Sequence, residues 1–510
     1  MERPVPDVTR ERTVAELGER AFDLLVIGGG IVGAGIAAQA TRAGLAVALV
    51  ERGDFGGGTS SASSKLVHGG LRYLRLGDVG LVREAHYERR ALSNVVAPHL
   101  VRRTPFLLPL YRGGPFTPAF VQSGILVYST LALSRLNWLV RPERARGLVP
   151  SLRTAGLRSC ALYADAWTND ARLCLANVVA AARAGATVAN DAEVTGLEQA
   201  GGRVVAARVT LDGEQVLVRA RSVVNASGPW VDHVRRLEDP AAVSSVRLSK
   251  GVHVLLSCDE RWEAALTIPQ DDVRVSFAVP WYGMLLLGTT DTPYDGDPGA
   301  VAVEPGDVDD VLCEAAVALA PELLARDRVR AMFAGLRVLP AGPGESASAR
   351  RETVFSLGPG RMLSVAGGKL TTYRRIALEA LRRLRPDLGL HRLDTRPWPL
   401  PDATHDAEPL LPVAVPATLR GHLLHLYGTR AGEVLEGALE DPTLLEPLHE
   451  DGPDIVAQAR YAYRSEWART PDDVLRRRTT VAWRGLDDDG ARERAAPVVG
   501  ARSVEPRAAR

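Results

Sequence analysis

The sequence Phe22-Asp23-Leu24-Leu25-Val26-Ile27-Gly28-Gly29-Gly30-Ile31-Val32-Gly33 joins an apolar run of strand length to a Gly-x-Gly-x-x-Gly turn. Small and apolar residues continue from 34 to 43, and a second apolar run, 45–50, ends at Glu51. Strand, glycine turn, helix, strand and acid stand in the order of a dinucleotide-binding βαβ unit. The sequence therefore predicts an α/β fold built around a nucleotide site.

Each glycine of this turn has its own physical role. Gly28 permits the tight turn, Gly30 lets the backbone approach a pyrophosphate, and Gly33 lets the helix pack closely on the strand. The helix N-terminus offers amide donors to phosphates, and Glu51 sits where a carboxylate can bind ribose hydroxyls. Nucleotide binding is the expected function of this segment; a tight turn without a ligand is the alternative.

The length and charge of the chain limit the remaining possibilities. The 510 residues exceed the roughly 250 to 300 at which single cores stop growing, so we expect two or three domains. The 62 basic and 61 acidic residues give a net charge of +1. Nucleic-acid binders carry a basic surplus gathered on one face, so no nucleic-acid partner is expected.

The basic residues are almost all arginine. Lysine occurs only at Lys65, Lys250 and Lys369. Arginine and lysine are not interchangeable where geometry matters, because the ammonium group is compact and the guanidinium is a wide planar fork. We therefore expect the three lysines to mark positions where an ammonium group is needed.

Cysteine usage indicates a reducing compartment. The four cysteines show neither a C-x-x-C pair nor zinc-ligand spacing, so we expect free thiols and no metal site. The first twenty residues alternate acids and bases and do not predict a secretory signal. The expected location is the cytoplasm, with the inner face of the cell membrane as a further option.

One segment could contact a bilayer. No run reaches about 18 apolar residues, so a spanning helix is not predicted. The nearest candidate is the stretch Phe120 to Val140, which is flanked by Arg112 and Arg141. It could lie flat on a membrane surface or form a half-buried helix of a large domain.

A long run of small and hydroxyl-bearing residues follows Glu51. It includes Thr59-Ser60-Ser61-Ala62-Ser63-Ser64-Lys65-Leu66-Val67-His68-Gly69-Gly70-Leu71-Arg72-Tyr73. Such a run suits backbone contact with an extended, buried cofactor such as FAD better than with a nicotinamide that enters and leaves. It resembles the signature of FAD-dependent glycerol-3-phosphate dehydrogenases, within the D-amino acid oxidase-like flavoprotein superfamily.

Further motifs agree with this resemblance from about residue 20 to 385. They are Asp165 to Leu173, Val223 to Trp230, Lys250-Gly251-Val252-His253, Gly288-Thr289-Thr290-Asp291, Gly335-Leu336-Arg337 and Gly367-Gly368-Lys369-Leu370-Thr371-Thr372-Tyr373. The loop from 341 to 351 is rich in Gly and Ser, which departs from the family pattern and weakens the assignment of Arg351.

The resemblance implies a Rossmann-like FAD-binding domain into which an antiparallel-sheet substrate domain is inserted. We expect the FAD-binding domain at 21–90, 151–235 and 345–390, and the substrate domain at 91–150 and 236–344. The proline-rich stretch 391–416 predicts a linker. Helical patterns from 417 to 500 predict a C-terminal helical domain, which we interpret as a cap or a dimerisation element.

The resemblance also implies the cofactor contacts. We expect FAD to be held by the glycine turn, the acid after it, the hydroxyl-rich run and two later turns, namely Gly28, Gly30, Gly33, Glu51, Thr59, Ser60, Ser63, Ser64, Lys65, His68, Gly69, Ala226, Gly228, Gly368, Lys369, Leu370 and Thr371. A covalent flavin link at His68 is an alternative.

Oxidation of an alcohol by a flavin needs the substrate C–H held over flavin N5 and a base for the hydroxyl proton. The resemblance places His253 near the substrate as this base, with His68 as its rival. Lys369 is expected to stabilise negative charge on the flavin. Arginine forks match phosphate, so the substrate end is assigned to Arg72, Tyr73, Arg337 and Asp291, with Arg351 as a weaker member.

The expected activity is FAD-dependent oxidation of sn-glycerol 3-phosphate to dihydroxyacetone phosphate, with electrons passed to a membrane quinone. For such an enzyme we also expect peripheral contact with the membrane and a homodimer. The alternatives are a glycerol-3-phosphate oxidase that uses dioxygen, an amine or amino-acid oxidase of the same fold, and a flavin-binding protein without catalysis.

Overall fold

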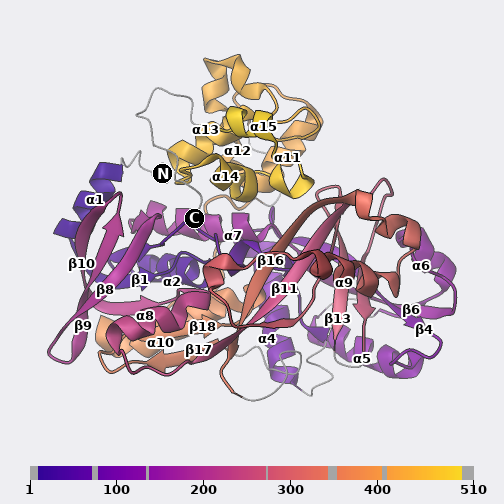
Figure 1. The fold of residues 1–510 in the computed structure, drawn as a ribbon, viewed down its shortest axis with the longest axis horizontal. Helices are drawn as coiled ribbons and strands as arrows, with labels where there is room; N and C mark the ends of the chain where they lie inside the picture. Colours follow the sequence, from indigo (N-terminus) through magenta and orange to yellow (C-terminus); the bar gives the residue numbers. More distant parts are fainter. Residues whose placement is uncertain are drawn as a thin grey trace.

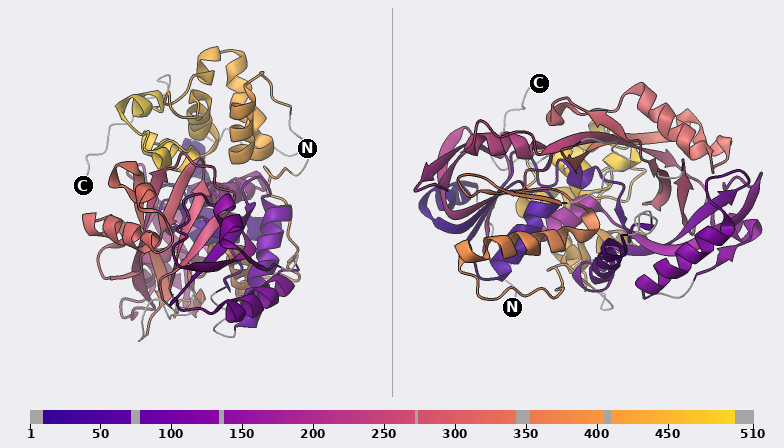
Figure 2. Two further views of the ribbon diagram at one scale, coloured as in Figure 1. Left: turned by 90° about the vertical axis from the view of Figure 1, so that its right-hand side faces the viewer. Right: turned by 90° about the horizontal axis from the view of Figure 1, so that it is seen from below.

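The computed structural model describes residues 10–71, 78–133, 137–271, 274–342, 353–404 and 410–496. Figure 1 shows three parts: one sheet with its helices, a second sheet beside it, and a group of short helices across their junction. In the left view of Figure 2 the C-terminal helices again lie at one end of the molecule. The three parts agree with the predicted fold class.

The first sheet is the nucleotide-binding one. Its order is β17-β18-β10-β1-β2-β7, and the neighbours of β1 are both parallel to it. Strands β8 and β9 extend β10 as an antiparallel meander. The strands are β1 (Ala21–Ile27), β2 (Val47–Val50), β7 (Thr187–Ala189), β8 (Ala192–Ala200), β9 (Arg203–Leu211), β10 (Glu214–Asn225), β17 (Thr353–Leu357) and β18 (Leu363–Gly367).

Both faces of this sheet are buried, as parallel sheets require. Along β1, Leu24 and Val26 face one core, while Leu25 and Ile27 face the other, because successive side chains alternate. The first core is completed by α2 (Ile31–Arg42), α7 (Asp170–Arg183) and α10 (Tyr373–Leu388). The second is completed by α1 (Arg10–Glu19), α8 (Val231–Glu238) and the β8–β9 meander.

The second sheet has the order β15-β11-β14-β13-β12-β4-β6-β3, with β16 beside β11 and β5 beside β6. Its pairings are antiparallel except that of β12 with β4. The strands are β3 (Leu66–Val67), β4 (Arg102–Tyr111), β5 (Leu139–Val140), β6 (Leu157–Trp167), β11 (Val246–Ser257), β12 (Ala265–Pro269), β13 (Val275–Trp281), β14 (Met284–Gly288), β15 (Thr292–Tyr294) and β16 (Val329–Pro340).

Helices cover this sheet as well. One face packs on α6 (Pro142–Leu148) and α9 (Pro305–Ala316), and the other on α4 (Val79–Ala91) and α5 (Pro118–Leu131). Strand β6 pairs along β4 in this sheet, although the expected boundary at residue 151 places it in the FAD-binding part. The reason is that strand pairing joins residues far apart in sequence, which a local pattern does not reveal.

The segment Phe120 to Val140 is not one helix. Helix α5 ends at Leu131, and Leu139 and Val140 form β5 against β6. No helix within the described ranges is both long and apolar enough to cross a membrane.

The C-terminal domain is built from α11 (Ala417–Tyr427), α12 (Ala431–Leu435), α13 (Val456–Ser465), α14 (Pro471–Asp473) and α15 (Asp489–Arg494). Gly428, at φ +54°, ends α11, so the helical pattern that begins at residue 417 is interrupted there. The residues between α10 and α11 include buried Leu400 and Asp402. That connection packs against the rest of the protein.

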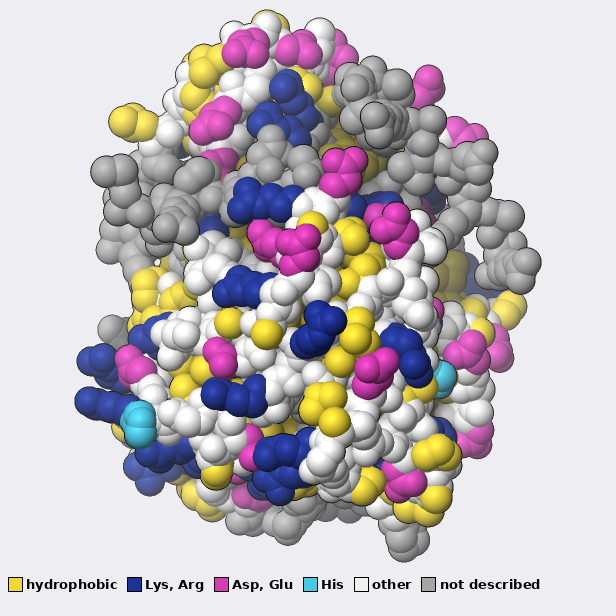
Figure 3. Space-filling model, turned by 90° about the vertical axis from the view of Figure 1, so that its left-hand side faces the viewer, with side chains coloured by type: hydrophobic (Ala, Val, Ile, Leu, Met, Phe, Trp, Pro, Cys, Tyr) yellow, Lys and Arg dark blue, Asp and Glu magenta, His cyan; other side chains and the backbone are white. Residues whose placement is uncertain are grey.

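Surface charge is finely mixed on the face seen in Figure 3, where basic and acidic side chains are interspersed with apolar ones. This distribution agrees with the nearly balanced composition of the chain.

A buried charge cluster docks the C-terminal domain onto α7. Glu466 accepts two hydrogen bonds from Arg172, at 2.6 and 2.8 Å, and one from Arg430 at 3.0 Å. Arg430 also pairs with Asp402 at 3.1 Å. Burial alone would raise the pKa of Glu466, but Arg172 and Arg430 hold it below its ordinary value.

We expect Glu466→Gln to lower the free energy of unfolding by about 3 to 5 kcal/mol, because two buried guanidinium groups lose their counter-charge. Urea unfolding at pH 7 measures the change. The control is Glu436→Gln at an exposed position, which should stay within about 0.5 kcal/mol. The pKa of Glu466 is lowered in the folded state. The difference in free energy of unfolding between wild type and Glu466→Gln is therefore fully present above roughly pH 4.3, and it is lost as the pH falls through the folded-state pKa. Equal stability of the two variants at pH 7 would contradict the expectation.

Candidate active site

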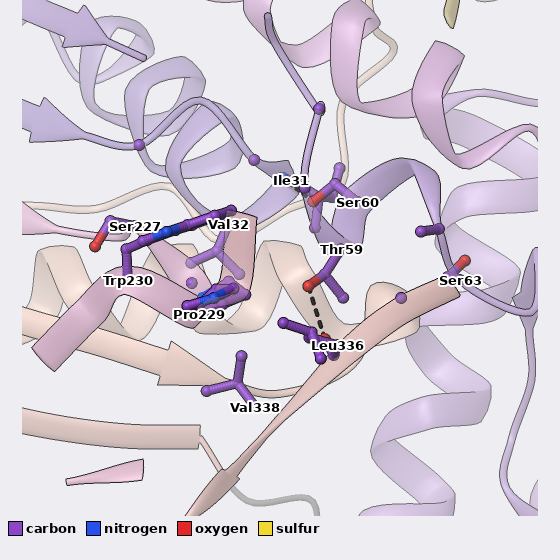
Figure 4. A pocket seen from close by; sticks show the side chains of 18 of the residues that line it. Ile31, Val32, Thr59, Ser60, Ser63, Ser227, Pro229, Trp230, Leu336 and Val338 are labelled. Atoms are coloured by element: carbon purple, nitrogen blue, oxygen red, sulfur yellow. Dashed lines mark hydrogen bonds between the residues drawn. The ribbon is translucent and has the colours of Figure 1, made fainter. Parts of the chain in front are cut away.

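A cavity of about 700 Å³ runs from the glycine turn after β1 to strands β11 and β16. Figure 4 shows Ile31, Thr59 and Ser60 on one side of it and Trp230 and Pro229 on the other. Both sheets contribute to its wall, so the cavity lies where the two parts of the molecule meet.

The glycine turn forms one end of the cavity. Gly28 has φ +108°, and a Cβ there would lie 2.6 Å from the Ala226 carbonyl oxygen. A Cβ on Gly33 would overlap the Gly28 carbonyl, so helix α2 can approach β1 only with glycine at this position. Gly30 caps α2 in an extended conformation, and the Ile31 amide donates to Ser60 Oγ at 2.9 Å. The N-terminus of α2 therefore borders the cavity.

Glu51 follows β2 and lines the same end. Its two oxygens accept from the amides of Gly29 (2.7 Å) and Gly53 (3.0 Å). Burial raises the pKa of Glu51, although the two amides oppose this change. The carboxyl group is thus held at one orientation beside the glycine turn, where it can bind hydroxyl groups of a ribose.

The hydroxyl-rich run crosses from one sheet to the other. Thr59, Ser60, Ser63 and Ser64 all line the cavity, and Thr59 Oγ1 donates to the Leu336 carbonyl of β16 at 2.7 Å (Figure 4). The short helix η1 (Thr59–Ser61) is therefore fastened to the second sheet.

Lys65 lies in this run but does not line the cavity. Its ammonium group contacts Asp170 at 2.7 Å and sits 4.6, 4.9 and 5.5 Å from the ring centres of Trp483, Phe333 and Trp281. Burial lowers its pKa, and Asp170 opposes the shift. The expected contact of the Lys65 side chain with the cofactor is corrected to a structural contact, because the side chain points into the protein interior.

Gly69 also lies outside the cavity lining. Its amide donates to Asp165 at 3.0 Å, and Asp165 in turn accepts from the Tyr128 hydroxyl at 2.8 Å and pairs with Arg89. This buried cluster positions the backbone beside His68, which does line the cavity. The sequence shows no signal for it, because its members come from four separate elements.

His253 occupies the other end of the cavity, on β11. Its Nε2 lies 2.9 Å from Ser64 Oγ, and its ring stacks on Phe333 with centres 4.8 Å apart. Burial, with Arg337 and Lys65 nearby, holds the pKa of His253 well below its ordinary value. The imidazole is therefore neutral near pH 7 and able to accept a proton.

Arg337 lies next to His253 and is already engaged by the protein. Its terminal nitrogens contact Ser249 Oγ (3.3 Å), Asp291 (3.0 Å), Thr289 Oγ1 (2.9 Å) and the Thr290 carbonyl (2.7 Å). Asp291 does not line the cavity. These contacts fix the guanidinium and offset part of its charge, so Arg337 is held rigidly where it lines the cavity.

Lys369 lines the cavity at the start of η7 (Leu370–Thr372), after Gly367 and Gly368 at φ +73° and +92°. Lys250, the lysine of the Lys250-Gly251-Val252-His253 motif, points away from the cavity. Lys250 and His253 are three residues apart on β11, so they face opposite sides of the sheet, and Lys250 pairs with Asp307 at 2.8 Å.

The remaining expected residues divide into two groups. Those that line the cavity are Ala226, Gly228, Gly368, Leu370 and Thr371. Those outside the described residues are Arg72, Tyr73 and Arg351, so their assignment stays a prediction.

Sequence reasoning missed several lining residues. Trp230 forms a wall of the cavity, and the Arg52 guanidinium lies 4.3 Å from its ring centre. Asp473 and Arg477 enter the lining from the C-terminal domain. Trp230 stood within a family-like motif, and Arg477 lies in the segment Trp467 to Thr479, which also resembles the family, although no local spacing relates Arg477 to the glycine turn.

Known proteins share this architecture. The chain matches a family described as FAD dependent oxidoreductase over residues 23–374 and one described as the C-terminal domain of alpha-glycerophosphate oxidase over residues 395–502. It is 37% identical over 484 residues to a glycerol-3-phosphate dehydrogenase of Mycobacterium leprae, covering 91% of this chain and 82% of the relative. A D-erythritol 1-phosphate dehydrogenase of Brucella abortus is 36% identical over 494 residues, covering 90% and 94%.

A solved structure agrees. The X-ray structure of the glycerol-3-phosphate dehydrogenase from Bacillus halodurans complexed with FAD has a TM-score of 0.74 to this chain at 28% identity, covering 94% of this chain and 89% of that one. Fold and cavity thus define an FAD-dependent oxidoreductase. The chain belongs to the FAD-dependent glycerol-3-phosphate dehydrogenase family, as the resemblance of its motifs predicted.

The cavity fits FAD. The turn at Gly28 and Gly33 has no room for a side chain, the N-terminus of α2 faces the cavity, and Glu51 is held beside it. Trp230 Nε1 is buried without a hydrogen-bond partner among the described residues. FAD is the cofactor of this family, and the residues that would hold it are the glycine turn, Glu51, the hydroxyl-rich run and the turn at Lys369.

Proposed function

We propose that this chain catalyses FAD-dependent oxidation of sn-glycerol 3-phosphate to dihydroxyacetone phosphate. The observation that carries the proposal is that neutral His253, fixed Arg337 and Lys369 all line the FAD cavity. Relatives that are glycerol-3-phosphate dehydrogenases support the same substrate.

In the proposed reaction, His253 accepts the proton of the substrate hydroxyl at Nε2, the nitrogen that now contacts Ser64. Bound FAD supplies the acceptor for the two electrons that leave the alcohol carbon. Ser64 orients the imidazole, and Lys369 offsets negative charge that develops nearby. Arg337 positions the polyol, and the phosphate is assigned to Arg72 with Arg351 as a weaker member.

The test is an anaerobic titration of the yellow holoenzyme. Glycerol 3-phosphate should bleach the flavin absorption, whereas glycerol should not. His253→Gln should retain FAD and bleach on the order of 10² to 10⁴ times more slowly, because proton transfer contributes this much. D-Erythritol 1-phosphate, the substrate named for one relative, is titrated in parallel. Faster bleaching by that compound, or none by glycerol 3-phosphate, would overturn the substrate assignment.

The electron acceptor is proposed to be a membrane quinone. The dehydrogenase relatives support this choice, while the C-terminal domain shares its family with an oxidase. Reoxidation of the bleached enzyme decides between them: a quinone analogue should restore the yellow colour quickly and air slowly. Rapid peroxide formation would favour dioxygen. A homodimer through the C-terminal domain remains a prediction that sedimentation can check.

Lys369 provides a charge-conserving prediction. We expect Lys369→Arg to slow bleaching on the order of tenfold, because a planar guanidinium cannot occupy the place of a compact ammonium beside the flavin. The matched control is Lys250→Arg, whose partner Asp307 lies outside the cavity. Stopped-flow absorbance measures both variants. Wild-type rates for Lys369→Arg would remove the lysine from the mechanism.

We further propose that α5 and the turn after it contact a lipid surface. Four large apolar side chains there are exposed: Phe120 (56%), Val127 (47%), Leu133 (77%) and Trp138 (61%). Exposed Arg112 and Arg141 flank them, and basic residues beside an apolar face are attracted to anionic headgroups. Quinone is soluble in lipid, so an enzyme that reduces it benefits from this contact.

Phe120→Asp with Val127→Asp should lower cosedimentation with phosphatidylglycerol vesicles by about tenfold or more, since each apolar side chain contributes roughly 1.5 to 3 kcal/mol when buried. The control is Val243→Asp, which is 79% exposed but far from α5 along the chain. Activity with a water-soluble acceptor should not change. Undiminished vesicle binding in a folded variant would exclude this surface.

A further inference from the structure

The loop from Arg52 to Gly58 covers one end of the cavity. Gly53, Asp54, Gly57 and Gly58 line it directly, and the Gly56 amide donates to the Gly29 carbonyl of the glycine turn at 3.0 Å. The loop is therefore fastened on its inner side to the turn that receives the cofactor.

Two arginines of the C-terminal domain also hold this loop. Asp54 pairs with both Arg477 and Arg478, and one oxygen lies 2.7 Å from Arg478 Nη2. The side chains of Asp54 and Arg478 are 6% and 0% exposed, and that of Arg477 is 13% exposed. Such buried, bidentate pairs are strong when both members are present and costly when one is removed.

Both arginines are themselves fixed within the C-terminal domain. Arg478 also donates to the Glu466 carbonyl at 2.6 Å, and Arg477 to Asp473 at 2.6 Å. They lie in η11 (Val474–Arg478), directly after the capped turn of α14. The position of Asp54 thus depends on the docking of the whole domain.

A second contact acts on the same loop without using charge. Phe55 is buried and meets the edge of the Trp467 ring with centres 5.6 Å apart. Asn190 donates to the Trp467 carbonyl at 2.7 Å, and the Asp191 amide donates to Gly53 at 2.9 Å. Residues 466–478 therefore contact both the loop 52–58 and the neighbouring residues Asn190 and Asp191.

We propose that the C-terminal domain is a cofactor lock, in which Arg477 and Arg478 hold Asp54 and keep the loop 52–58 closed over the nucleotide end of FAD. Release of the pair frees the loop and lets FAD dissociate. By linkage, cofactor binding and domain docking stabilise one another. The proposal rests on FAD as the family's cofactor and is independent of the substrate.

A matched pair of neighbouring arginines tests the lock. Arg477→Gln removes one partner of Asp54. Arg476→Gln is the control, because the ion pairs of Arg476 are with Asp472 and Asp487 of the same domain, at 3.7 and 3.6 Å. Holoenzyme is diluted, and the rise of free FAD fluorescence gives the rate of release. We expect Arg477→Gln and Asp54→Asn each to release FAD about tenfold faster or more, and the control to match wild type.

The double variant separates the lock from a direct cofactor contact by Arg477, which itself lines the cavity. If Arg477 acts through Asp54, the double variant should release FAD about as fast as the faster single variant, because coupled residues are not additive. Multiplied effects would overturn the lock, as would unchanged release in both single variants. Thermal unfolding of the apoproteins checks folding, and Arg477→Gln serves alone if Asp54→Asn does not fold.

These results are separable from the proposed activity. Faster FAD release in the variants, together with a wild-type enzyme that glycerol 3-phosphate does not bleach, would support the lock and reject the substrate. Normal bleaching with unchanged release would do the reverse.

Discussion

Asp170 is completely buried at the start of α7, and its two oxygens organise the run of residues that joins both sheets. One oxygen accepts from the amide and hydroxyl of Ser63, at 3.1 and 2.7 Å. The other accepts from Lys65 Nζ at 2.7 Å and from the Ala171 amide at 2.9 Å. Burying an ionised carboxylate costs free energy unless hydrogen-bond donors surround its oxygens. The residues that supply these donors are therefore held in place, and with them the backbone from Ser63 to Lys65. The cavity hydroxyls of Ser63 and Ser64 are placed by this constraint.

The same constraint reaches His253 through aromatic rings. Lys65 neutralises the charge of Asp170 and lies against the ring of Phe333. The same ring also stacks on His253. Trp483 of the C-terminal domain packs edge-on against Phe333, with centres 5.1 Å apart. A compact ammonium fits among these rings, and a wider guanidinium would displace one of them. Lys65 and Lys250 thus serve buried ion pairs, and of the three lysines only Lys369 lines the cavity.

Features that depend on residues close together in the sequence could be predicted, whereas contacts between distant residues could not. The turn at Gly28 and the acid at Glu51 were predictable because strand, helix and strand are contiguous, and their steric demands are local. The fold class and the cofactor followed from that unit and from the family motifs. The direction of the Lys65 side chain was not predictable, because its partner Asp170 is 105 residues away. The contact of Arg477 with Asp54, across 423 residues, depends on domain docking that no local pattern encodes.

The charges around the cavity are arranged by function despite the overall balance of the chain. Two carboxylates, Glu51 and Asp54, lie at the nucleotide end, where a ribose needs acceptors but a pyrophosphate would be repelled. Backbone amides donate to Glu51, and two arginines neutralise part of the charge of Asp54. These contacts reduce the repulsion between the two carboxylates and a pyrophosphate while their oxygens stay in place as hydrogen-bond acceptors. Arg337 and Lys369 also line the cavity and bring positive charge to it. The net charge of +1 for the whole chain thus conceals charges of both signs along one cavity, to which the C-terminal domain contributes Asp473 and Arg477.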